Sequence, residues 1–269
     1  MGDQAKPPEK RWQPFKRFDG RIEGWRGFLM ETAVIGIGVL LALGAEQMVE
    51  QWTWDAKVAR AEEALRNEQG AIFILMAERA VVTPCVLAQI DRLREHVLTD
   101  EGERQPLEPV VDAFGSWVLR APYRPISDDV WQAENTAGTV THMDYERQQY
   151  TALTYTLLDG FLDRQEQNFA GQTELLVLAE PIALDQSTKL HLLQTLAEQR
   201  ARVVLQEIVA SQLMTGITEL GRAPDASAVE ALFTQQSGTI DYCRENELPL
   251  GDWRKAMARF GGTLVEDTN

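Results

Sequence analysis

The chain has 269 residues, of which 44% are hydrophobic, so it is long enough to bury one large core or two small ones. Its formal net charge of −15 argues against a nucleic-acid partner, because nucleic acids are recognised through basic patches. Two cysteines and three histidines leave little material for a metal centre.

Residues 1–27 form a polar arm that differs in charge from the rest of the chain. The arm holds seven basic and four acidic side chains, whereas the remainder holds 19 basic and 37 acidic ones. Pro7 and Pro14 disfavour a helix, and Trp12 and Phe15 alternate with basic residues. Two interpretations stay open, a basic-aromatic strip on the inner membrane surface and a tail without fixed structure.

Residues 28–49 predict a transmembrane helix. No charge occurs from Thr32 to Ala45, and about 20 apolar residues at 1.5 Å each span the 30 Å hydrocarbon core of a bilayer. Tryptophans favour the headgroup level, and Trp25, Trp52 and Trp54 bracket the run. Glu31 would then lie about one turn inside the interface, with its role left open. The alternative is the buried core helix of a soluble protein.

Basic flanks remain in the cytoplasm, so the charge asymmetry predicts a topology. Residues 1–27 would be cytoplasmic, and residues 50–269 would form an extracytoplasmic domain, periplasmic in a bacterium with an inner membrane. A cleaved signal peptide is the alternative, but the apolar run is longer than a usual signal core. We therefore favour an uncleaved anchor in the inner membrane.

One side of the predicted span is smooth. Gly38, Ala42 and Ala45 follow at helical spacing, and such faces let membrane helices pack closely. The same glycines resemble part of a dinucleotide-binding fingerprint, but Leu41 replaces its third glycine and no second strand follows. The smooth face therefore indicates helix association.

A resemblance appears on the residues around the span. The run Gly38–Gln47, the tryptophans that follow it, and the motif Leu65-Arg66-x-Glu68 resemble a family of uncharacterised bacterial single-pass membrane proteins. The resemblance covers about residues 28–70. It implies an anchored, helical, extracytoplasmic protein and no particular activity.

The rest of the chain predicts an all-α fold, an antiparallel bundle into which the membrane helix continues. Pro84 should kink or end the helix that leaves the membrane. Val110–Leu119 reads as a short apolar helix. Further helices are expected from Ser127 or Asp128 to Gly138, and from Asp144 to Ala179 after a capping box at Thr141. The next is expected from Thr188 to Leu220, closed by Gly221, and the last from Ser227 to Glu245 with a soft break at Gly238.

The most site-like stretch surrounds Trp131, where Glu134, Asn135 and His142 gather hydrogen-bonding groups as a ligand pocket would. The simpler interpretation places Trp131 in the core and the polar groups in water. None of the histidines has a second ligand at metal spacing, so we expect no metal, no cofactor and no catalytic residue.

Cys85 and Cys243 allow one disulfide, and two buried free thiols are the equal alternative.

These features favour a membrane-anchored scaffold or accessory subunit that acts through helix–helix contacts. Its expected partners are membrane lipid and either further copies of itself or the other subunits of a membrane complex. A sensor-like ligand-binding bundle in the periplasm is the first alternative. A periplasmic enzyme of unrecognised type is the second.

Overall fold

The computed structural model describes residues 24–99, 105–112, 115–235 and 238–262. Helix accounts for 78% of the structure and strand for 2%, which confirms the all-α prediction. The chain divides into two compact units, Met1–Thr53 and Trp54–Asn269. Most of the basic N-terminal arm, residues 1–23, lies outside the described residues.

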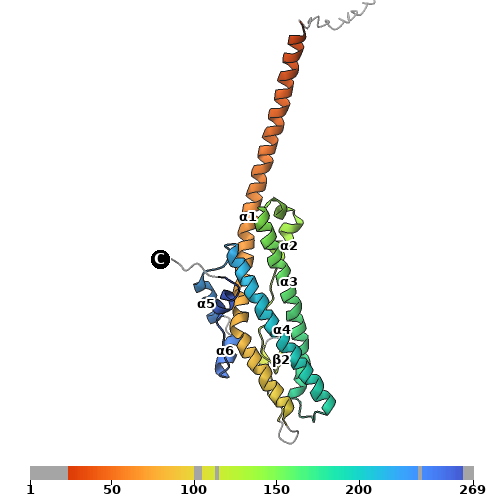
Figure 1. The fold of residues 1–269 in the computed structure, drawn as a ribbon, viewed down its shortest axis with the longest axis vertical. Coiled ribbons are helices and arrows are strands. Elements are labelled where there is room, and N and C mark those ends of the chain that lie inside the picture. Colours follow the sequence, from red (N-terminus) through yellow and green to blue (C-terminus); the bar gives the residue numbers. More distant parts are fainter. Residues whose placement is uncertain (1–23, 100–104, 113–114, 236–237, 263–269) are drawn as a thin grey trace, which may run out of the picture. The chain divides into compact units, whose positions relative to one another are not determined.

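Helix α1 (Gly24–Leu98) is 75 residues long and runs through the boundary between the units (Figure 1). Its part in the first unit is long and apolar enough to cross a membrane, and none of the apolar window is buried. Leu40 and Leu41, for example, are 70% and 69% exposed. In the second unit the same helix buries an apolar side that includes Leu65, Phe73 and Ile90.

Helix α1 continues through Pro84, so the prediction that it ends there is wrong. Proline has no N–H and deprives the carbonyl of Ala80 of its donor. Gly251 lies at this gap, and its N–H donates to the carbonyl of Val81 at 2.7 Å. A Cβ on Gly251 would stand only 2.6 Å from the Ala80 oxygen, so only glycine fits. The segment before helix α7 (Trp253–Ala258) thus packs against α1 beside the proline.

Helices α3 (Tyr145–Glu174) and α4 (Gln186–Glu219) lie side by side and antiparallel (Figure 1). Asp144 and Asp185 cap their N-termini by accepting bonds from backbone N–H groups. The cap is therefore Asp144 and not the predicted Thr141, which lies in the short 3₁₀ helix η1 (Thr139–His142). A second 3₁₀ helix, η2 (Leu175–Ala179), ends the α3 segment.

The predicted helix over Val110–Leu119 is wrong. Strands β1 (Val110–Asp112) and β2 (Gly115–Trp117) pair antiparallel there, with Val110 opposite Trp117. β-Branched valines favour extended backbone, and Gly115 adopts a φ of 141° that other residues avoid. Trp117 is buried and packs on Phe169 with ring centroids 5.0 Å apart.

Four shorter helices complete the described fold: α2 (Asp129–Thr136), α5 (Ala226–Gln235), α6 (Gly238–Glu245) and α7 (Trp253–Ala258). The expected last helix is thus split, and Ser227 lies inside α5 instead of capping it.

The buried side of α4 differs from the expected one. Leu196 and Val203 are buried as predicted, whereas Val204 and Ile208 are 39% and 38% exposed. The inward positions before and after Val203 carry polar side chains instead, Gln199 and Gln206, and both are fully buried. Because glutamines occupy some of the inward positions, the spacing of apolar residues alone does not show which side of α4 is buried.

Candidate functional site

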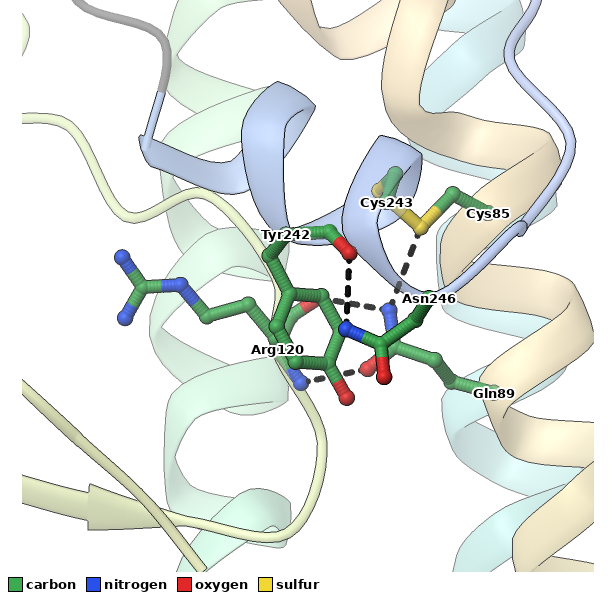
Figure 2. Close-up of a disulfide and its surroundings, with 6 residues drawn as sticks. All are labelled: Cys85, Gln89, Arg120, Tyr242, Cys243 and Asn246. Atoms are coloured by element: carbon green, nitrogen blue, oxygen red, sulfur yellow. Dashed lines mark hydrogen bonds between the residues drawn. A yellow bond between two sulfur atoms is a disulfide. The ribbon is translucent and has the colours of Figure 1, made fainter.

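A disulfide joins Cys85 of α1 to Cys243 of α6, which resolves the alternative that the sequence left open (Figure 2). Both cysteines are fully buried. Gln89 lies beside the bridge, and its Nε2 donates to Cys85 Sγ at 3.4 Å and to the Arg120 carbonyl at 3.0 Å. The Arg120 N–H donates back to Gln89 Oε1 at 2.7 Å. The bridge therefore also anchors the segment after β2.

Glu68 of α1 is the centre of a second cluster. Its carboxylate accepts hydrogen bonds from the N–H groups of Val130, at 2.8 Å, and Trp131, at 3.4 Å. These N–H groups belong to the first turn of α2 and have no acceptor within that helix. A carboxylate is favoured at a helix N-terminus by the positive end of its dipole. Glu68 thus caps α2 from a different helix, whereas Asp128, at the N-cap itself, makes no side-chain cap bond.

Tyr155 of α3 completes this cluster from the other side. Its hydroxyl donates to Glu68 Oε2, and its ring stacks on Trp131 with centroids 4.9 Å apart and planes 6° from parallel. Burial raises the pKa of Tyr155, and the hydrogen bond to Glu68 raises it further. The phenol therefore stays neutral and serves as a donor.

Arg222, after α4, lies behind the same cluster and is 3% exposed. Its Nη1 donates to Gln69 Oε1 at 2.9 Å and to Thr151 Oγ1 at 3.1 Å. Burial lowers the pKa of Arg222, and the nearby Glu62 carboxylate opposes that shift. Through these bonds a residue of the α4–α5 connection is tied to both α1 and α3.

A third polar group lies further along α1. Glu78 accepts two hydrogen bonds from Arg124, at 2.9 and 3.1 Å, in a bidentate ion pair. Arg79 points into the interior, where its Nη2 donates to the Pro122 carbonyl at 2.8 Å and to Gln165 at 3.2 Å. Burial lowers the pKa of Arg79 to about 10, and Glu78 partly opposes this. The guanidinium remains charged at neutral pH.

The structure distributes the four predicted site residues among three environments. Trp131 joins the Glu68 cluster, half-buried on Tyr155. Glu134 is half-buried and Asn135 exposed on α2. His142 is exposed, and its ring stacks on Trp54 with centroids 3.8 Å apart.

The residues predicted to lie at membrane interfaces or in helix packing belong to α1. Trp25 and Trp52 are 74% and 69% exposed. Trp54 is half-buried between His142 and Lys57, whose Nζ lies 4.2 Å from the ring centroid. The face of Gly38, Ala42 and Ala45 is exposed, and a Cβ added to Gly38 would touch nothing.

Two hollows lie beside these polar clusters. A shallow groove of about 460 Å³ lies between α1 and the segment entering α2, lined mainly by apolar side chains such as Ile72 and Ile126, with Glu68 at its wall. A much smaller cavity of about 10 Å³ lies in the interior beside Arg79, lined by glutamines of α3 and α4. Across the described ranges, no group of three His, Cys, Asp or Glu side chains is placed to hold a metal ion.

Comparison with protein-family models, with curated proteins and with solved structures gives no match for this chain. The function is therefore argued from the geometry alone.

Sequence reasoning missed most of the polar residues that the fold brings together. Glu68 belongs to the motif that carries the resemblance, but no local pattern connects it to Tyr155, 87 positions away. A signal did exist on α3, because Gln165, Asn168 and Gln172 recur at helical spacing among apolar residues. Polar residues at core-facing positions indicate a buried hydrogen-bond network.

Proposed function

We propose that this protein is a membrane-anchored accessory or scaffold subunit, with one span in α1 and an extracytoplasmic helical domain formed by the second unit. The observation that carries the proposal is the apolar run of α1, of which no part is buried. Water would penalise about 20 apolar side chains exposed together, and lipid would not. The basic arm before the run supports a cytoplasmic N-terminus.

The buried disulfide supports the placement of the second unit outside the cytoplasm. Structural disulfides persist in oxidising compartments and are rare in reducing ones. Cys85 and Cys243 are 158 positions apart, so their bridge closes a long loop and restricts the unfolded chain. The polar clusters support a structural role, because the hydrogen bonds of Glu68, Tyr155 and Arg222 join helices to one another.

Topology is tested by paired reporter fusions in a bacterial host. A periplasm-active phosphatase and a cytoplasm-fluorescent protein are each inserted after residue 10 and after residue 150. Phosphatase activity only at 150 and fluorescence only at 10 are the expected results. The same reporter response at both sites would overturn the proposed topology.

Association is tested by purification of the full chain in mild detergent. We expect a homo-oligomer or a larger complex. Ala42→Ile, which roughens the smooth face, should weaken the assembly, whereas Leu41→Ile on the neighbouring face should not. A monomeric particle from native membranes, with no co-purifying subunit, would contradict the scaffold role.

The groove beside Glu68 favours a second candidate, a ligand-binding bundle of the sensor type. Its volume of about 460 Å³ falls within the range of small-molecule sites. A thermal-shift screen of the full chain against small metabolites tests it. A true ligand should raise the melting temperature of the wild type but not of Ala71→Phe, which fills the groove; the absence of any stabilising compound would remove this candidate.

A further inference from the structure

Helices α3 and α4 meet across a row of buried amides instead of a purely apolar seam. Five side chains form it, and all are at least nine-tenths buried: Gln165, Asn168 and Gln172 of α3, with Gln199 and Gln206 of α4. Burying an amide costs free energy unless its hydrogen bonds are satisfied. The bonds of this row therefore have to be counted atom by atom.

Two bonds within the row are made. Asn168 Nδ2 donates to Gln206 Oε1 at 2.6 Å, and Gln199 Nε2 donates to the backbone carbonyl of Asn168 at 2.9 Å. Gly171 leaves the space for the second bond, since a Cβ there would lie 2.0 Å from Gln199 Nε2. The position of the Gln199 amide is thus fixed by a backbone acceptor.

Three buried atoms of the row have no hydrogen-bond partner among the residues that the structure describes. They are two acceptors, Asn168 Oδ1 and Gln199 Oε1, and one donor group, Gln206 Nε2. Reversing both amides of the Asn168–Gln206 pair exchanges their roles but again leaves one donor and one acceptor open. The Gln199 oxygen stays open in either case, because its nitrogen must face the backbone carbonyl. A bound molecule must therefore supply two donors and one acceptor, whichever way the amides are oriented.

These three residues all line the small interior cavity beside Arg79. Its volume of about 10 Å³ is close to the minimum that one water molecule needs, about 10–15 Å³. That size excludes a metabolite. A halide would accept hydrogen bonds only, and a metal cation would bind acceptors only, so neither serves a set of two acceptors and one donor beside a guanidinium.

We propose that this cavity is a specific binding site for a single internal water molecule. The water donates its two hydrogens to Asn168 Oδ1 and Gln199 Oε1 and accepts a hydrogen bond from Gln206 Nε2. It completes the polar contact between α3 and α4 and fixes their register, since a shift of either helix by one turn would separate the three atoms.

The test is oxygen-17 relaxation dispersion of water on the full chain in detergent micelles, which counts long-lived internal waters. Gln206→Met keeps the side-chain volume and removes the donor, and Gln194→Met makes the same change on the exposed face of α4. We expect Gln206→Met to lose one long-lived water per chain, and Gln194→Met to lose none. An unchanged count in a Gln206→Met protein with wild-type helicity would overturn the proposal.

If Gln206→Met fails to fold, a structure of the wild-type protein tests the proposal instead. A crystal structure at a resolution that shows ordered waters should contain one water within hydrogen-bond distance of Asn168, Gln199 and Gln206. An empty cavity, or amides rearranged so that they satisfy one another, would overturn the proposal as well.

Discussion

The two halves of α1 are one uninterrupted helix, yet apolar side chains are exposed in the first half and buried in the second. In the first unit, Val34, Leu40 and Leu43 are at least half exposed, and no apolar residue of the window is buried. In the second unit, Leu65, Phe73 and Met76 are fully buried. Both halves are helical, so helix formation itself does not account for the difference.

The difference follows from how charge is placed along the helix. From Thr32 to Ala45 no charge interrupts the apolar surface on any side, which suits a uniform apolar surrounding. After Trp54 charged residues return, except at residues 69–77 and 80–90, where most side chains are buried in a protein core. Where charges enter that core they are tied, as Glu78 is to Arg124. One helix can therefore suit an apolar surrounding in one half and a protein core in the other, when the placement of charged residues changes along it.

The largest expected contrast comes from one substitution made in each half. Phe73→Ala removes a fully buried ring that packs edge-on against Trp253, and should lower the free energy of unfolding of the second unit by about 3–5 kcal/mol. Phe28→Ala, at a ring that is 51% exposed, should change it by less than about 0.5 kcal/mol. Urea unfolding followed by circular dichroism measures both. Equal effects would erase the contrast between the halves.

An arginine introduced into the exposed half of α1 distinguishes a lipid surrounding from water, because a charge is costly in lipid. Leu40→Arg should cost about 3 kcal/mol of insertion free energy and reduce the fraction of chain that resists carbonate extraction from membranes. Leu190→Arg, at a leucine of α4 that is 66% exposed, should leave both that fraction and stability nearly unchanged. If Leu40→Arg were as harmless as Leu190→Arg, the exposed half would have to be surrounded by water.

Carboxylates sharpen the comparison further. Glu68→Gln removes the charge that caps α2 and accepts from Tyr155, and should lower stability by about 1–2 kcal/mol. Glu50→Gln, on the exposed half of α1, should have almost no effect. Thermal unfolding of both variants is the measurement, and a large loss in Glu50→Gln would indicate a partner for that residue.

The smallest effect concerns alkaline pH. The pKa of Tyr155 is raised in the folded state, so below the unfolded value of about 10 the phenol is protonated in both states and its contribution is fully present. Above about pH 10 only the unfolded chain releases this proton, so stability should fall by up to about 1.4 kcal/mol per pH unit. Tyr155→Phe should flatten this decline, and Tyr145→Phe, at an exposed tyrosine, should not. Parallel pH profiles of wild type and Tyr155→Phe would refute the assignment.

Much of the architecture is encoded locally and could be predicted. Composition and period predicted an all-helical chain, and Gly221, which adopts the left-handed conformation, marked the C-terminal end of α4. The passage through Pro84 could not be predicted, because Gly251, which packs there and donates to the Val81 carbonyl, is 167 positions away. The hairpin at Val110 was missed because its apolar run is too short to show a period.

The candidate site was predicted less well, for a related reason. Trp131 was singled out, but its partners Glu68 and Tyr155 come from helices whose facing sides no local pattern reveals. The buried glutamines of α4 shifted the apparent apolar face toward Val204 and Ile208. Long-range polar contacts depend on how the helices are rotated, which tertiary packing decides.

The segment around Gly251 has a consequence for how the second unit comes apart. Between positions 243 and 253, Cys243, Gly251 and Trp253 each contact α1, by a covalent bridge, a main-chain hydrogen bond and an aromatic contact. These contacts join the C-terminal part of the second unit to its N-terminal helix. Fraying from either terminus is blocked, and amide exchange in the middle of α1 should report all-or-none opening.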